Sequence, residues 1–131
     1  MADDLALLRE WLEILPEGRF ELFSGRIAED FALRLPYPPP GVPGEFLGRE
    51  VVCERLQSTA KGRSAIIFSD LVLRRTDDPE LFVTTGNGQA TMNSGKIYRN
   101  SYVMFTRIRD GMVLEHIEYL NPLAVMEAMG D

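Results

Sequence analysis

Residues 110–123 read DGMVLEHIEYLNPL, and this stretch decides the fold of the 131-residue chain. Asp110-Gly111 is a dipeptide typical of two-residue hairpin turns. A strand is predicted after it, over residues 112–120, and this strand pairs with the one that precedes the turn. Asn121-Pro122 then begins a helix, because asparagine caps a helix N-terminus and proline fits the first helical position. The stretch therefore predicts a β-hairpin followed by a closing helix.

The predicted strand also carries the main chemical candidates. Side chains alternate along a strand, so His116 and Glu118 share one face. Two leucines complete this face and three residues occupy the other: Leu114 and Leu120 on the first, and Glu115, Ile117 and Tyr119 on the second. An imidazole beside a carboxylate among leucines is a candidate general acid–base pair. The same pair is also typical of a structural ion pair.

The chain before the hairpin predicts further strands. They cover residues 65–75, 81–92 and 97–109, with turns at 76–79 and 93–95. Gly86-Asn87-Gly88 interrupts the middle strand, and we interpret it as a bulge, since glycine inside a strand often marks one. The alternative is a hairpin there, which would add a strand to the sheet.

The N-terminal half is predicted to be mainly helical. Four leucines at three- and four-residue steps, with Trp11 beside them, give a first helix that Pro16 ends; they are Leu5, Leu8, Leu12 and Leu15. Asp3 or Asp4 can cap its start. A short helix over 17–23, a strand at 31–35, a stiff proline-rich loop at 36–44 and a helix over 48–58 follow. Helices followed by consecutive antiparallel strands predict an α+β fold, with helices on one face of a curved sheet.

Two features of this arrangement predict a cavity and a partner. Few short helices cover a long curved sheet, which favours a pocket between them. The strand over 97–109 is apolar on both faces, with Val103 and Phe105 on one and Tyr102 and Met104 on the other. A sheet covered on one side would be polar on the other, so we expect a second copy to cover the outer face as a homodimer. The alternative is scattered surface hydrophobes.

Composition excludes several classes of protein. The net charge of −6 disfavours nucleic-acid binding. One cysteine, Cys53, and one histidine exclude a disulfide, a thiolate cluster and a multi-histidine zinc site. No apolar run reaches the ~18 residues of a membrane helix, and the start of the chain is acidic. We therefore expect one cytoplasmic domain over residues 1–131, with no membrane partner and no cofactor.

Several side chains are candidates for ligand binding. Tyr98, Asn100 and Tyr102 share one face of the long strand and offer two phenols and an amide. The other candidates are charged residues inside apolar strands and two further aromatic residues: Arg34, Asp70, Trp11 and Tyr37. Tyrosines at this spacing are also typical of a core, as is Trp11 on its helix stripe.

The chain resembles the nuclear transport factor 2-like superfamily. The resemblance rests on the leucine-rich first helix, on Gly48-Arg49-Glu50 before the third helix, and on residues 110–123. Within the superfamily it is most similar to the phenazine-biosynthesis A/B proteins. The motifs are Asp78-Pro79, Gly95-x-x-Tyr98-x-Asn100 and the ending from Glu118 to Pro122. The resemblance implies a cone-shaped α+β fold with a curved antiparallel sheet, and a SnoaL-like domain.

The resemblance also implies a function. It implies a pocket between the sheet and the first helices, a dimer through the sheet, and Glu118 as the pocket acid–base group. Leu35 stands where ketosteroid isomerase has its catalytic aspartate, and no Arg–Asp pair joins Glu118 as in limonene-epoxide hydrolase. Both reactions are therefore disfavoured. The phenazine proteins take their pocket histidine from an earlier position than His116.

Together these observations predict a small, cofactor-independent enzyme of the SnoaL type. It would move a proton on a hydrophobic or aromatic carbonyl metabolite, as an isomerisation, cyclisation or condensation. Glu118 would exchange the proton with help from His116. The alternative is a module of the same fold that binds a small ligand or dimerises without catalysis.

Overall fold

The computed structural model describes residues 4–23 and 25–130. Within them, six strands form one sheet in the order β2-β1-β6-β5-β4-β3. The strands are β1 Ile27–Arg34, β2 Glu45–Leu47, β3 Ile67–Arg75, β4 Leu81–Thr91, β5 Ile97–Arg109 and β6 Met112–Tyr119. The helices are α1 Asp4–Ile14, α2 Arg49–Ala60 and α3 Pro122–Met129. The predicted α+β fold is confirmed.

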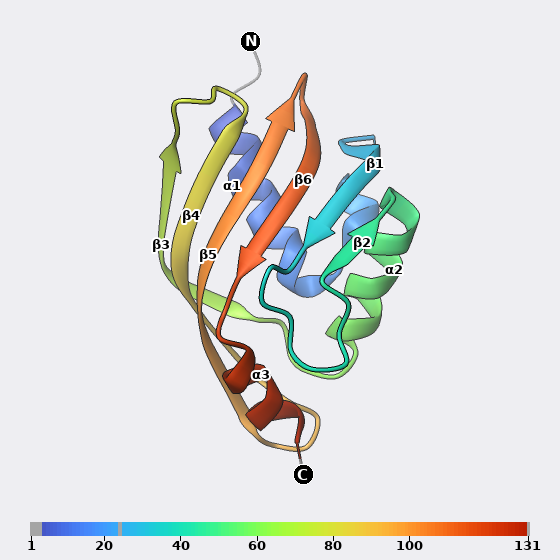
Figure 1. The fold of residues 1–131 in the computed structure, drawn as a ribbon, viewed down its shortest axis with the longest axis vertical. Helices are drawn as coiled ribbons and strands as arrows, with labels where there is room; N and C mark the ends of the chain where they lie inside the picture. Colours follow the sequence, from blue (N-terminus) through green and yellow to red (C-terminus); the bar gives the residue numbers. More distant parts are fainter. Residues whose placement is uncertain (1–3, 24, 131) are drawn as a thin grey trace.

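Figure 1 shows how the helices surround the sheet. The first helix, α1, lies against one face, α2 lies beside the β1–β2 end, and α3 lies at the far end of the long strands β4 and β5. None of the helices in residues 4–23 and 25–130 is long and apolar enough to cross a membrane.

The C-terminal hairpin and helix form as the sequence predicts. Asp110 and Gly111 both have positive φ, 52° and 73°, which the tight turn between β5 and β6 requires. Asn121 caps α3, because its side-chain oxygen accepts the Leu123 N–H at 3.0 Å. Pro122 occupies the first turn. Local chemistry therefore determines this part of the fold.

The N-terminal half differs in three details from the prediction. The first strand begins at Ile27, earlier than residue 31, and pairs with β6 in parallel. The predicted helix over 17–23 is instead two short 3-10 turns, Leu15–Glu17 and Phe20–Phe23, separated at Gly18 with φ 68°. The short strand β2 was not predicted, since three residues cannot show an alternating pattern. Of the two predicted caps of α1, Asp3 lies outside the described residues.

The glycines of β4 mark a close approach, not a turn. The pairing of β4 with β5 continues unbroken from Leu81 to Thr91, so the alternative of a hairpin at Gly86–Gly88 is wrong. The bulge predicted at these glycines is also not in β4: the irregularity lies in the neighbouring strand β3, where Asp70 has φ 56°. A Cβ on Gly88 would lie 2.8 Å from side-chain atoms of both Ile66 and Tyr102. Gly88 therefore lets the side chains of Ile66 and Tyr102 pack directly onto β4.

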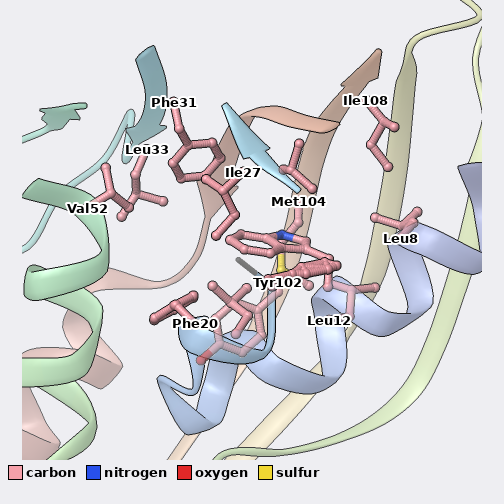
Figure 2. Close-up of a cluster of buried hydrophobic side chains, with 14 of the residues drawn as sticks. Leu8, Leu12, Phe20, Ile27, Phe31, Leu33, Val52, Tyr102, Met104 and Ile108 are labelled. Atoms are coloured by element: carbon pink, nitrogen blue, oxygen red, sulfur yellow. The ribbon is translucent and has the colours of Figure 1, made fainter. Parts of the chain in front are cut away.

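The core lies between α1 and the inner face of the sheet. Figure 2 shows Leu8 and Leu12 of α1 gathered with Met104 and Ile108 of β5. Trp11 is fully buried at its centre and contacts three phenylalanine rings at centroid distances of 5.5–5.9 Å. These rings belong to Phe20, Phe23 and Phe31. This packing fixes α1 over the strand that carries His116.

Candidate active site

A cavity of about 400 Å³ opens on the inner side of the sheet, next to the core. Its apolar walls come from β1, β2, β3, α3 and the residue before β3, and include Leu33, Phe46, Phe68, Val125 and Ile66. The proline-rich loop adds Pro39 and Val42. Most of the surface is thus apolar. The charged or hydroxyl-bearing side chains that line it are Arg55, Ser58 and Thr59 of α2, together with Arg63, Tyr98, Tyr102 and Glu118.

Glu118 of β6 lines this cavity. Its side chain is 19% exposed, and its Oε1 lies 3.6 Å from Nε2 of the fully buried His116. The two residues share a face of β6, as the alternation predicted. A shift in the pairing of β5 with β6, however, makes Val113 the fully buried residue before His116, where Leu114 was predicted.

His116 is held from its other ring nitrogen. Nδ1 lies 3.2 Å from the Trp11 indole nitrogen and 3.0 Å from the Thr106 hydroxyl. Thr106 is the residue opposite His116 in the β5–β6 ladder. The imidazole therefore lies behind Glu118, in the core, and does not line the cavity itself.

Two tyrosines of β5 bring hydroxyl groups to the cavity. The oxygens of Tyr98 and Tyr102 lie 2.6 Å apart, and the Asn100 amide donates to the Tyr98 oxygen at 2.9 Å. One phenol proton lies between the two oxygens. The other phenol proton has no acceptor among the described residues, so one O–H can donate to a guest.

Both phenols are held in their neutral form. Burial raises the pKa of Tyr102 far above its ordinary value, and the neighbouring Tyr98 and the charge of Glu118 add to this rise. Burial also raises the pKa of Tyr98, against the opposing effect of its hydrogen bonds with Tyr102 and Asn100. Neutral phenols are hydrogen-bond donors, which is the form that a carbonyl oxygen requires.

Arg63 is a cavity residue that the sequence did not indicate. It lies in the loop after α2, and its Nη1 donates to the backbone oxygens of Pro16 at 3.0 Å and Ser64 at 3.2 Å. Burial lowers the pKa of Arg63, while the nearby Tyr102, Tyr98 and Glu118 raise it. No carboxylate of the described residues forms an ion pair with it. A loop arginine after a glycine has no periodicity that could have revealed this position.

The remaining predicted ligand-binding residues lie away from the cavity wall. Asn100 is buried and acts on Tyr98, and Trp11 is in the core. Arg34 forms ion pairs with Glu115 at 2.9 Å and Glu45 at 3.0 Å. The remaining two are surface residues: Asp70 accepts from Asn87 at 3.2 Å, and Tyr37 is 66% exposed with its ring against Tyr119.

The described residues hold no group of three or more His, Cys, Asp or Glu side chains placed to bind a metal ion. A carboxylate, a free phenol O–H and a guanidinium border one apolar space.

Two curated relatives cover most of the chain. An uncharacterized PhzA/B-like protein of Pseudomonas aeruginosa is 34% identical over 121 residues, which are 91% of this chain and 84% of the relative. The uncharacterized protein YesE of Bacillus subtilis is 24% identical over 124 residues, 94% of this chain and 84% of the relative. No family model matches the chain.

Solved structures share the fold. A Bacillus subtilis protein named as a candidate isomerase superposes with a TM-score of 0.85 at 23% identity, over 96% of this chain and 91% of its own. A candidate polyketide cyclase of Xanthomonas campestris has a TM-score of 0.79 at 18% identity, covering 96% of each chain. A nuclear transport factor 2-like protein of Burkholderia xenovorans has a TM-score of 0.78 at 17% identity, over 96% of this chain and 95% of its own.

Proposed function

The chain belongs to the PhzA/B-like proteins and has the nuclear transport factor 2-like fold, and on this basis we propose that it is a cofactor-independent acid–base enzyme. Its reaction would be a proton transfer on a small carbonyl compound, leading to isomerisation, cyclisation or condensation. The observation that carries the proposal is the position of Glu118, which borders an apolar cavity together with an unused phenol O–H.

Each part of the proposed mechanism uses a group of the cavity. The free O–H of the Tyr98–Tyr102 pair donates to the carbonyl oxygen of the guest. Glu118 takes the proton from the carbon next to that carbonyl, which leaves an enolate. The phenol stabilises the negative oxygen of the enolate, as donors aimed at developing charge do. In an isomerisation Glu118 then returns the proton to a different carbon of the guest. In a cyclisation or condensation the enolate carbon instead bonds to a second carbonyl carbon, and Glu118 gives the proton to the oxygen of that carbonyl.

The guanidinium of Arg63 supports the same step electrostatically. It borders the cavity without an ion-pair partner among residues 4–23 and 25–130, and its position is fixed by two backbone oxygens. A fixed positive charge in a poorly hydrated space stabilises negative charge that develops on a guest. We therefore assign Arg63 to enolate stabilisation.

Deuterium exchange tests the proposal without knowledge of the natural substrate. One- and two-ring ketones such as cyclohexanone and 2-tetralone are incubated with the protein in D2O, and the loss of the proton signal next to the carbonyl is followed by NMR. We expect the wild type to accelerate exchange and Glu118→Gln to lose about 10²–10⁴-fold of this rate.

Glu115→Gln is the matched control, since Glu115 lies on the same strand but pairs with Arg34 on the other side of the sheet. It should exchange ketones at the wild-type rate. A wild type that binds ketones, seen as a rise in Tm, without accelerating exchange would refute the enzyme and support the binding module. Equal rates for Glu118→Gln and the wild type would remove Glu118 from the mechanism.

We also propose that the protein is a homodimer formed through the outer face of the sheet. Apolar side chains on this face are solvent-exposed in the single chain, including Val103 at 39% and Tyr119 at 37%. Burial of such neighbouring apolar side chains is favourable, and a two-fold dimer is the commonest way to achieve it.

A further inference from the structure

The only tryptophan and the only histidine of the chain contact each other in the core. Trp11 comes from α1 and His116 from β6, 105 positions apart, and both side chains are fully buried. The indole nitrogen lies 3.2 Å from Nδ1, with the two rings edge to face at 5.8 Å. This contact restricts which nitrogen of the imidazole can carry a proton.

The indole N–H decides which imidazole nitrogen carries the proton. It can only donate, so Nδ1 of His116 has to accept and therefore has no proton of its own. The proton of the neutral ring is then on Nε2. Thr106, 3.0 Å from the same Nδ1, can donate or accept and so does not select a tautomer by itself.

The carboxylate nearest to the resulting Nε2–H is that of Glu118. Nε2 is buried and has no hydrogen-bond partner in the described part of the chain, and its nearest carboxylate oxygen is Oε1 of Glu118 at 3.6 Å. This separation is slightly longer than the roughly 3.2 Å limit of a good N–H···O bond. A small rotation of the Glu118 carboxylate, which lies at the edge of an open cavity, is enough to close it.

We propose that Trp11 is a positioning residue that acts on Glu118 through His116. Its N–H holds His116 as the Nε2–H tautomer, the imidazole N–H binds Oε1, and Oε2 remains directed to the guest. The opposite tautomer would place a lone pair against the carboxylate and repel it. The inference rests on the proposed function only in assigning proton transfer to Glu118.

A single-atom replacement tests this role. Trp11→3-benzothienylalanine keeps the size of the ring but replaces the indole N–H by sulfur, so the fold is retained. With ¹⁵N-labelled histidine, long-range ¹H–¹⁵N correlation reports one imidazole, because the chain has one histidine. We expect the Nε2–H pattern in the wild type, and a mixture of both tautomers in the replaced protein.

The exchange assay gives the second readout. The replaced protein should lose about tenfold in kcat for ketone exchange, the effect of one weak hydrogen bond to a charged group. KM should stay unchanged, because Trp11 does not line the cavity. Phe23→Leu is the control for packing, since Phe23 is buried and stacks on Trp11 at 5.7 Å. It should preserve both the tautomer and kcat.

Three results would overturn the inference. They are an unchanged Nε2–H pattern without the indole N–H, an equal loss of the pattern in Phe23→Leu, or a changed tautomer with unchanged kcat. If the wild type exchanges no ketone, the proposed function fails, and with it the action of Trp11 on catalysis. The tautomer spectra then still decide whether Trp11 sets the state of His116.

Discussion

The neutral form of Tyr102 predicts how the stability of the protein depends on alkaline pH. Burial raises the pKa of this phenol far above its ordinary value of 10.0, so the folded state keeps the proton when the unfolded state loses it. The contribution of the neutral Tyr102 phenol to the free energy of unfolding is therefore fully present below pH 10 and is lost as the pH rises further. At pH 11 a phenol with a pKa of 10 is mostly ionised in the unfolded chain. This ionisation stabilises the unfolded state and lowers the free energy of unfolding by about 1.4 kcal/mol.

Tyr102→Phe isolates this contribution. At pH 9 the variant should be less stable than the wild type by about 1 kcal/mol, because it lacks the hydrogen bond between Tyr102 and Tyr98. At pH 11 the wild type alone carries the cost of keeping Tyr102 protonated. The difference in the free energy of unfolding should therefore vanish or change sign between the two pH values.

Urea unfolding at pH 9 and pH 11, followed by the fluorescence of the buried Trp11, measures this difference. Phe68→Leu is the matched control, since the Phe68 ring packs edge to face on Tyr102 at 5.6 Å but cannot ionise. Its offset from the wild type should be the same at both pH values. A constant offset for Tyr102→Phe as well would refute the reasoning that this phenol stays neutral in the folded protein.

Three further substitutions test the packing, the assembly and the last helix. Gly88→Ala should destabilise the protein by about 1–3 kcal/mol in urea unfolding, since its Cβ would lie 2.8 Å from the Tyr102 ring; Gly62→Ala, with one neighbour at 3.6 Å, should not. Val103→Lys should shift the protein from a dimer to a single chain in sedimentation velocity, and a wild type that sediments as one chain would contradict the dimer. Asn121→Ala should cost about 1 kcal/mol through loss of the cap of α3, and Asn121→Asp, which keeps an acceptor, should restore it; equal stabilities would argue against the cap.

The agreement between sequence and structure is best where the signal is local. The turn at Asp110-Gly111 and the cap at Asn121 follow from the conformational and hydrogen-bonding preferences of those residues alone. Alternation along one strand was also enough to place His116 and Glu118 on a common face. The same alternation wrongly placed Leu114 on the buried face. The register shift between β5 and β6 is the reason, because it depends on both strands and is not visible in the sequence of β6 alone.

The ligand-binding candidates show the limit of such patterns. Tyr98 and Tyr102 were identified as one face of a strand, and they do line the cavity. Arg34 and Asp70 were predicted to bind a ligand because they are charged residues within apolar strands. In the structure, side chains from other segments pair with them at the surface. The sequence of a strand does not show which residue of a distant segment will pair with a charged side chain on that strand.

By itself, the sequence indicated the α+β fold, the strands other than β2 and the face that His116 and Glu118 share, because turns, caps and strand periodicity involve neighbouring residues. Only the tertiary structure placed Arg63 at the cavity and the indole of Trp11 against His116. Contacts between residues so far apart in the chain depend on how the helices pack against the sheet. That packing is a property of the whole chain, and no short stretch of it contains the information.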